Sequence, residues 1–324
     1  MLLIVSPSEG TALLDQANSL PDKNMVASRI EDLPIRVVSP KVGVLARIKN
    51  IWTFRELLVS MVRKELRIKY KNSVLGFLWS LLNPALYLVI YYIVFQKILK
   101  NNMPLFAIFL LCGLLVWNFF SNALSSATTT IINNAGIVKK VAFPREILAL
   151  ASVGAALIFF LLQACVLVLA LAIFQVMPAF GYLWLIPFAL FALLLFASSL
   201  AIALSAINVY LRDTQHLMEL VLLAWFWATP IVYPFQELGV RLTQKGLLFL
   251  YFFNPVTVIV LTFQRALYAK LSYLNNGKAI PLLPGYSPGW FALQLLIVVL
   301  VSAVLFLGAL MLFARLEGNF AEEL

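Results

Sequence analysis

The stretch FRELLVSMVRKELRIKYKNSVLGFLWSLLNPALYLVIYYIVF, Phe54–Phe95, decides the fold. At 100° per residue, most apolar side chains of Phe54–Lys71 share one face and most basic ones the opposite face. Arg55, Glu65 and Lys69 interrupt the apolar face. The sequence then becomes apolar over about 20 residues, the length that spans a bilayer as a helix. It therefore predicts an amphipathic helix on a membrane surface that leads into a transmembrane helix.

Five more apolar segments follow, so the fold class predicted is an all-α polytopic membrane protein. Of the 324 residues, 63% are apolar and only 12% charged, with a mean hydropathy of +0.96. A soluble domain would carry about 25% charged residues, which excludes that class. The six predicted crossings lie near Leu75–Leu99, Leu105–Ile131, Ile147–Val176, Leu183–Val209, Leu217–Pro234 and Trp290–Phe313.

Lysine and arginine are unevenly divided between the two sides of these crossings. The side that would carry both termini holds 17 of them, 12 within the first 72 residues, and the opposite side holds seven. The positive-inside tendency therefore predicts cytoplasmic termini in a plasma membrane, with anionic lipids and not nucleic acid as partners. The predicted parts are a partly disordered cytoplasmic tail at 1–50, an interfacial helix at 51–73, a six-span domain at 74–314 and a cytoplasmic C-terminal tail at 315–324.

The connection between the fifth and sixth predicted crossings has an apolar middle, Leu247–Leu261. Asn254 and Pro255 break it, and its 15 residues fall short of a full crossing. A pair of re-entrant helices that dips into the outer leaflet fits this pattern better than two more crossings.

Groups for catalysis or energy conversion are missing from the sequence. No G-x-x-x-x-G-K-[ST] loop for nucleotide phosphates occurs, and no spaced carboxylate pair marks a membrane face. His216, the one histidine, is interpreted as a loop residue and not as a metal ligand. Glu146 and Glu219, at the cytoplasmic ends of two crossings, have no evident deep partner. We expect no catalytic residue, metal or cofactor in this chain, and an energy source in another subunit.

Aromatic residues make up 13% of the chain and concentrate in the first, second and fifth crossings. Sugar rings stack on aromatic rings, and Tyr and Trp also donate hydrogen bonds, so an aromatic conduit would let a polysaccharide slide. For any single residue, ordinary packing or an interfacial belt is the alternative. The candidate channel-lining residues are Tyr87, Tyr91, Phe95, Trp117, Phe120, Trp225, Trp227 and Tyr233.

Several short stretches together resemble one family. YKNSVLGFLWSLLNP, Tyr70–Pro84, is followed in order by GIVKKVAFPREIL, NVYLRDTQH, ATPIVYP and FNPVTVIVLTFQRALY, which ends at Tyr268. In this combination the chain resembles, over roughly Arg55–Phe313, the permease subunits of ATP-binding cassette (ABC) exporters for O-antigen and teichoic acid.

The resemblance implies a homodimer that pairs with two cytoplasmic ABC ATPase subunits, which would bind Mg-ATP. It implies a lateral gate for a lipid anchor between the first and fifth crossings of opposing protomers. It also implies that Gly136–Glu146 is the helix that couples to the ATPase. The residues assigned to coupling are Gly136, Lys139, Lys140, Pro144, Arg145 and Glu146.

Export of a polyprenyl-diphosphate-linked polysaccharide is the leading hypothesis. Arg63, Lys64, Arg67 and Lys69 would attract the diphosphate or, equally well, anionic lipids in general, at about 1 kcal/mol per residue. The interfacial helix would be a topology anchor or also a docking surface for the ATPase. One alternative is an ABC permease for a smaller lipid or drug. Another is a polytopic glycosyltransferase, which would need the acid pairs that the sequence lacks.

Overall fold

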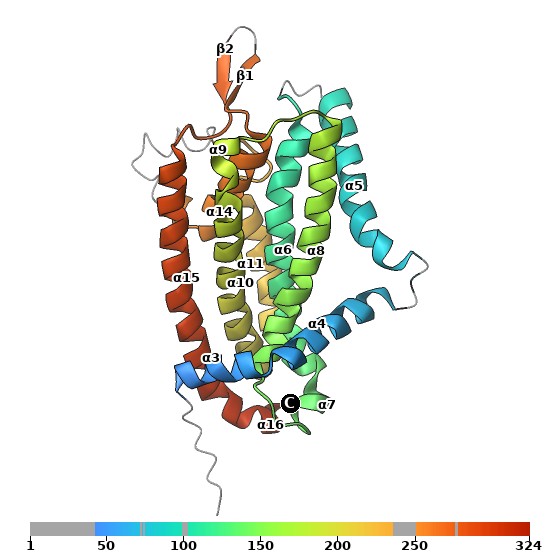
Figure 1. The fold of residues 1–324 in the computed structure, drawn as a ribbon. Coiled ribbons are helices and arrows are strands. Elements are labelled where there is room, and N and C mark those ends of the chain that lie inside the picture. Colours follow the sequence, from blue (N-terminus) through green and yellow to red (C-terminus); the bar gives the residue numbers. More distant parts are fainter. Residues whose placement is uncertain (1–42, 72, 74, 99–102, 236–250, 276–277) are drawn as a thin grey trace, which may run out of the picture. The chain divides into compact units, whose positions relative to one another are not determined.

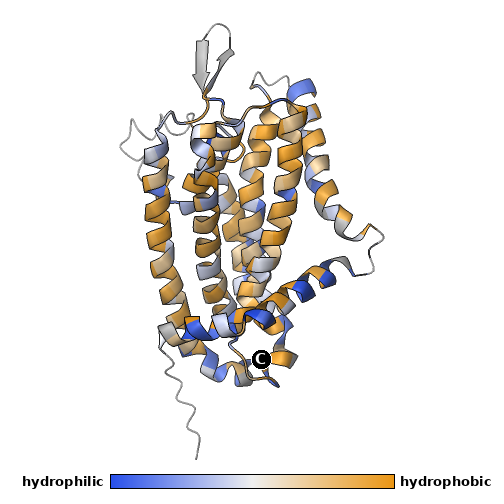
Figure 2. Cartoon of the chain, viewed as in Figure 1, coloured by the Kyte–Doolittle hydropathy of each residue, from blue (hydrophilic) through white to orange (hydrophobic). Residues whose placement is uncertain are grey.

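Long apolar helices dominate the structure (Figure 1). The computed structural model describes residues 43–71, 73, 75–98, 103–235, 251–275 and 278–324. Colouring the ribbon by hydropathy shows apolar residues along most of the length of these helices (Figure 2). Five helices in these ranges are long and apolar enough to cross a membrane: Leu81–Ile98, Phe106–Asn133, Glu146–Ile173, Phe180–Tyr210 and Pro288–Asn319.

Helix α6 (Phe106–Asn133) is the most deeply buried of the five. It packs against α8 (Glu146–Ile173) and α10 (Leu185–Tyr210), and α10 also forms the most extensive helix pair with α15 (Pro288–Leu316). The short helix α9 (Phe180–Leu183) precedes α10. These helices enclose the hydrophobic core, and α6 is the helix against which the others pack.

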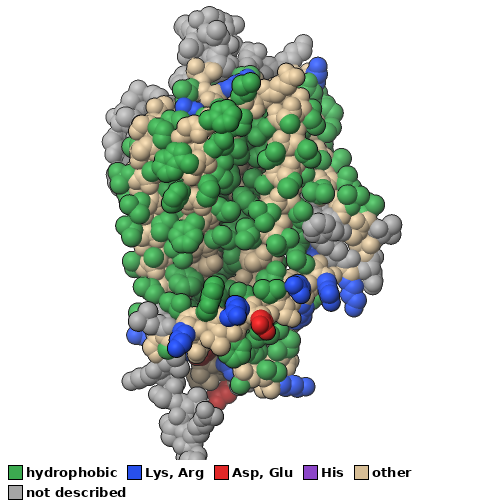
Figure 3. Space-filling view, viewed as in Figure 1, with side chains coloured by type: hydrophobic (Ala, Val, Ile, Leu, Met, Phe, Trp, Pro, Cys, Tyr) green, Lys and Arg blue, Asp and Glu red, His purple; other side chains and the backbone are tan. Residues whose placement is uncertain are grey.

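Two helices, α3 (Val44–Thr53) and α4 (Arg55–Tyr70), lie across one end of the bundle (Figure 1). Lys and Arg side chains gather along the same end in the space-filling view (Figure 3). Helix α4 packs along α8, and a Cβ atom built on Gly154 would lie 2.8 Å from Cγ2 of Val62. Helix α3 is continuous across residue 50, where the sequence predicted the end of the tail, and the predicted division of the chain stays a prediction. The position of α4 at a membrane surface stays a prediction.

The first crossing is assembled from three short pieces. A 3-10 turn, η1 (Gly76–Leu78), leads into α5 (Trp79–Tyr91), which continues as a π-helix, η2 (Tyr92–Ile98). Pro84 lies inside α5, as membrane helices tolerate. This crossing is the least buried of the five, and Figure 1 shows its α4 end inclined away from α6 and α8.

Helix α11 (Thr214–Trp227) corresponds to the predicted crossing Leu217–Pro234 but ends earlier. Its 14 residues are too few to cross a bilayer alone. The chain turns at Thr229 and Pro230, where the Ile231 amide donates to the Thr229 carbonyl at 2.8 Å. The predicted six-span count therefore stays a prediction.

Helix α14 (Pro255–Phe263) begins at the predicted break and continues as a π-helix, η3 (Gln264–Tyr268). Asn254 caps it by accepting a hydrogen bond from the Val256 amide at 3.1 Å, and Pro255 occupies the first turn. All side chains of Val256–Phe263 are buried. The other half of the predicted re-entrant pair falls largely at 236–250, outside the described residues.

The strands β1 (Ser272–Asn275) and β2 (Lys278–Pro281) form an antiparallel hairpin that was not predicted. It lies at the end of the bundle opposite α3 and α4 (Figure 1). The dipeptide Asn276–Gly277, common in hairpin turns, stands between the two strands in the sequence. At the other end, η4 (Glu317–Asn319) and α16 (Phe320–Glu323) close the chain.

Candidate functional site

One face of α6 is polar although the rest of the helix is apolar. Asn118, Asn122, Ser126, Thr129 and Asn133 follow one another at spacings of three and four residues, so they share this face. Three of them are exposed and the other two half-buried. We call this row the polar stripe. Hydrocarbon cannot satisfy amide and hydroxyl groups, so a polar stripe on a membrane helix faces water, a ligand or protein.

The polar stripe is flanked by α11 towards one end. A cavity of about 270 Å³ lies between the two helices. Ser126 and Thr129 line it from α6, and Gln215 and Glu219 line it from α11. The stripe therefore has further polar groups beside it where α11 begins.

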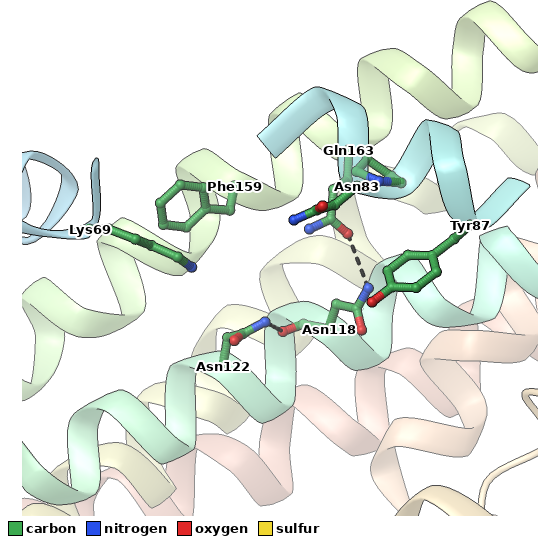
Figure 4. Close-up of a pocket in the computed structure, with 8 residues that line it drawn as sticks. Lys69, Asn83, Tyr87, Asn118, Asn122, Phe159 and Gln163 are labelled. Atoms are coloured by element: carbon green, nitrogen blue, oxygen red, sulfur yellow. Dashed lines mark hydrogen bonds between the residues drawn. The ribbon is translucent and has the colours of Figure 1, made fainter. Parts of the chain in front are cut away.

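Towards the other end, the polar stripe borders a cavity of about 280 Å³ (Figure 4). We call it the Lys69 cavity. Asn118 Nδ2 donates to Gln163 Oε1 of α8 at 3.2 Å, and Asn122 Nδ2 donates to the Asn118 carbonyl at 2.6 Å. Four helices contribute to its lining, which consists of Lys69, Asn83, Pro84, Tyr87, Asn118, Asn122, Phe159 and Gln163.

Lys69 is the only charged residue among the described residues that line this cavity. Its ammonium lies 4.0 Å from the centroid of the Phe159 ring on α8, and no salt bridge to it occurs among the described residues. Lys69 is exposed as a whole residue, but its ammonium lies against Phe159 and is partly removed from water, and this desolvation lowers its pKa. An anion in the cavity would favour the charged form and gain a charge-assisted hydrogen bond.

The other three predicted basic residues do not join this cavity. Arg63 and Arg67 are exposed, whereas Lys64 donates to the Asn134 side chain just beyond α6. The sequence treated Lys69 as a charge misplaced on the apolar face, free to meet a partner. The structure instead places it against Phe159 of its own chain.

The aromatic candidates divide into exposed, half-buried and buried side chains. Tyr87 and Trp227 are 48% and 59% exposed, and Tyr91, Phe95, Trp225 and Tyr233 are half-buried. Trp117 and Phe120 are buried, with the Phe120 ring 5.6 Å from that of Phe196 and 5.1 Å from that of Trp225. Trp117 and Phe120 therefore pack in the core of the protomer, and their channel-lining role stays a prediction.

Asn254 joins the end of α11 to the start of α14. Its Oδ1 accepts from the Trp225 indole N–H at 2.9 Å, and its Nδ2 donates to Thr229 Oγ1 at 3.0 Å. Nearby, the buried Gln264 amide donates to the Pro230 carbonyl at 3.1 Å. The indole N–H of Trp225 is therefore committed inside the chain and is not offered to a sugar.

The predicted coupling segment lies at the same end of the bundle as α3 and α4 (Figure 1). It consists of α7 (Ala135–Val138), a turn and a non-helical stretch that reaches Arg145. Gly136, Lys139 and Lys140 are exposed, and Pro144 stands two residues before the start of α8. We call residues 135–145 the elbow. Its two lysines are free to meet a partner.

Arg145 and Glu146, at the end of the elbow, turn inward. Arg145 Nη1 donates to the Glu317 carbonyl at 2.6 Å, and Glu146, which is 1% exposed, forms an ion pair with Arg47 of α3. Arg47 also pairs with the Glu317 carboxylate. The expectation that Glu146 has no deep partner is therefore wrong.

Glu219 differs from Glu146 because it is exposed and lies 3.8 Å from His216 Nδ1. His216 itself lies in the first turn of α11 and not in a loop, which corrects its predicted place. Among the described residues, no three His, Cys, Asp or Glu side chains gather in a way that could hold a metal ion.

A bundle of long apolar helices, with a polar stripe along one of them and an exposed basic elbow at one end, defines a transmembrane subunit of a transporter. The chain belongs to the ABC-2 type transporter family, whose model matches residues 56–268. The match runs from α4 to η3 and includes the elbow and every residue of the Lys69 cavity. Arg47 and Glu317 lie outside it.

Two relatives carry the same description. The chain is 31% identical over 278 residues to an O-antigen export system permease protein RfbA of Myxococcus xanthus, covering 86% of this chain and 98% of that protein. It is 29% identical over 215 residues to an O-antigen export system permease protein RfbA of Klebsiella pneumoniae, covering 66% of this chain and 81% of that protein.

Sequence reasoning missed the polar stripe and the ionic contacts of Arg47. The polar stripe could have been predicted from the sequence, because Asn, Ser and Thr recur at helical spacing inside an apolar segment. Nothing comparable marks the contacts of Arg47, since its partners stand 99 and 270 residues away along the chain.

Proposed function

We propose that this chain is the transmembrane subunit of an ATP-driven exporter that moves a polyprenyl-diphosphate-linked polysaccharide across the plasma membrane. The polar stripe of α6 is the observation that carries the proposal. Its amide and hydroxyl groups can exchange hydrogen bonds with sugar hydroxyls, and it carries no charge that would hold one sugar tightly. The description of both relatives as O-antigen export permeases supports a polysaccharide over a drug as cargo.

In this proposal the chain crosses the membrane six times with both ends in the cytoplasm. The contact of Arg47 with Glu317 supports an even number, because it joins a helix before the first crossing to the turn after the last. The five long helices alone would place these two residues on opposite sides. Helix α11, with the turn after it, supplies the remaining crossing.

Two copies of the chain would face each other across their polar stripes. The exposed faces of α5 and α11 flank the stripe, and Tyr87 and Trp227 project from them. The exposed aromatic rings would offer sugar-stacking surfaces, and the stripe would offer hydrogen bonds. Such a conduit exists only between protomers, which accounts for exposed polar groups on one copy of a membrane helix.

The Lys69 cavity is suited to the diphosphate of the lipid carrier. Lys69 supplies a positive charge, and the amides of Asn83, Asn122 and Gln163 supply hydrogen-bond donors. The cavity lies where α4 approaches α5, α6 and α8 (Figure 4), and α4 itself crosses the end of the bundle at which Lys and Arg gather (Figures 1 and 3). A diphosphate there would sit at the cytoplasmic leaflet with its prenyl chain beside α5.

In the complex, the ATPase subunits would bind the elbow and move it when they hydrolyse ATP. Lys139 and Lys140 are the exposed charges through which a partner could hold it, whereas Arg145 and Glu146 are engaged within the chain. The chain itself would bind no nucleotide.

Cells that lack this chain provide the test. We expect them to lose surface polysaccharide, to accumulate the lipid-linked polymer on the cytoplasmic side, and to recover with the native chain. The doubly substituted Asn122→Leu, Ser126→Leu chain should not restore export, while still co-purifying with the ATPase. A changed drug resistance with unchanged surface polysaccharide would contradict the proposal and favour a drug permease.

A further inference from the structure

Four charged side chains from three distant parts of the sequence meet at the cytoplasmic end of the proposed exporter. Arg47 comes from α3, Arg145 and Glu146 from the junction of the elbow with α8, and Glu317 from the turn after α15. Arg47 pairs with both glutamates, and Arg145 donates to the Glu317 carbonyl. We call these four residues the ionic staple.

The two arginines and two glutamates balance in charge. A balanced cluster of this kind stabilises a fold little compared with apolar packing, but removing Arg47 leaves the buried Glu146 carboxylate without its partner. The cluster therefore resists separation, and its members move together. Its best-attested use in proteins is to fix a register or a switch, and not to supply stability.

Glu317 is in turn tied to the far helices of the bundle. The hydroxyl of Tyr210, at the end of α10, donates to the Leu316 carbonyl at 2.7 Å. The fully buried Phe320 ring lies 5.5 Å from the Phe313 ring of α15 and 6.2 Å from the Tyr210 ring. The turn that contains Glu317 thus contacts the proposed cytoplasmic ends of both α10 and α15 and holds them together.

The elbow is joined through the backbone only to α6 and α8. Without the staple, a push on the elbow would reach α10 and α15 only through side-chain packing. We infer that Arg47 is a positioning residue of the transport cycle: the ionic staple carries movement of the elbow to α15 and α10, so that both halves of the protomer respond to the ATPase. This inference rests on the proposed function, in which the ATPase moves the elbow.

Arg47→Met removes the contacts of Arg47 with both glutamates, and Glu317→Gln removes the charge of one of them. Both variants keep the Arg145 bond to the Glu317 carbonyl, and Arg47→Lys keeps the positive charge. Lys49→Met, at an exposed position of α3, and Glu322→Gln, at an exposed position of α16, are the matched controls. In the assembled complex with its ATPase, we expect R47M and E317Q to hydrolyse ATP normally and to export about tenfold less polysaccharide, a typical size for coupling between sites. R47K should fall between, and the controls should match the native chain.

The number of ATP molecules hydrolysed per exported polymer separates positioning from folding. A structural defect would lower hydrolysis and export together and leave this ratio unchanged, which would overturn the inference. A native ratio and native export in R47M would overturn it as well. If the native complex itself exports nothing, the proposed function fails.

Hydrogen exchange on the full chain tests whether the ionic staple links the elbow to the turn after α15. This measurement remains possible even if R47M reduces assembly with the ATPase. We expect R47M and E317Q to speed amide exchange both in the first turn of α8 and at residues 317–323. Faster exchange confined to α3 would show that the three segments are independent and would sink the inference.

Discussion

Asn254 shows how one side chain can hold an irregular junction together. It caps α14 while its amide bridges Trp225 and Thr229 at the end of α11. Without Asn254, the Trp225 indole N–H and the Val256 amide would lose their hydrogen-bond acceptor. The junction therefore depends on an amide, which both accepts and donates at one position.

Asn254→Ala should destabilise the protein by about 1–3 kcal/mol, because it leaves the Trp225 indole N–H without its acceptor and removes the donor to Thr229 Oγ1. Asn254→Asp keeps the two acceptor contacts, but it places a carboxylate oxygen in place of the donor to Thr229 Oγ1, so it should not restore the native stability. Thermal unfolding in detergent measures both, with Asn319→Ala at an exposed position as the control. Equal midpoints for the alanine variants at 254 and 319 would refute this role.

Lys69→Met should weaken binding of polyprenyl diphosphate by about tenfold, or 1.4 kcal/mol, because the cavity loses its one charge. Lys71→Met, at an exposed position two residues on, should bind like the native protein. The lowered pKa of Lys69 also determines how the affinity for the diphosphate changes with pH. The diphosphate binds the protonated amine, so affinity should fall as pH rises through that lowered pKa. Fluorescence titration in micelles across a pH series measures both effects.

Helix α4 is positioned by close contact with α8. Gly154 lets Val62 approach to a distance at which a Cβ atom on residue 154 would clash. The contact brings Lys69, two turns further along α4, over the Phe159 ring of α8. The packing of two helices thus sets the position of a charge at the Lys69 cavity.

Gly154→Val should destabilise the protein by about 1–3 kcal/mol by overpacking this contact. Gly308→Val is the matched control, because no atom lies within 4 Å of a Cβ built on that helical glycine. Adding Val62→Ala to Gly154→Val should recover part of the loss. Unfolding midpoints of the four proteins are the measurement, and a failure of V62A to rescue would mean that the strain lies elsewhere.

The protomer as a whole turns two different surfaces outward. The apolar one includes Leu300 and Val304 of α15, and the polar one is the stripe of α6. In the proposed dimer the first faces lipid and the second faces a conduit that admits water. Accessibility to a water-soluble reagent therefore tells the two surfaces apart.

Cysteines at 122 and 126 should react with a water-soluble maleimide in membranes that contain the complex, whereas cysteines at 300 and 304 should not. Cys112 and Cys165 are first replaced by alanine, since Cys165 is exposed. Labelling of denatured protein controls for reactivity. Protection of 122 and 126 equal to that of 300 and 304 would contradict a hydrated conduit between protomers.

The long apolar elements were predictable because composition and length suffice to find a membrane helix. The second crossing, predicted to begin at Leu105, begins at Phe106. The early end of α11 was not predictable, because Asn254, a later part of the chain, fixes that turn through Thr229. The ionic staple could not be predicted for the same reason, because the partners of Arg47 are distant along the chain. In the sequence, Arg47 is one of many basic residues near the N-terminus.

The Arg47–Glu317 contact also joins two residues that are translated far apart in time. Glu317 follows Arg47 by 270 residues, so the contact can form only after the intervening helices have been made. Until then, Arg47 can pair with Glu146 but lacks its second carboxylate. The contact between α3 and the turn after α15 is therefore a late one as the chain is synthesised.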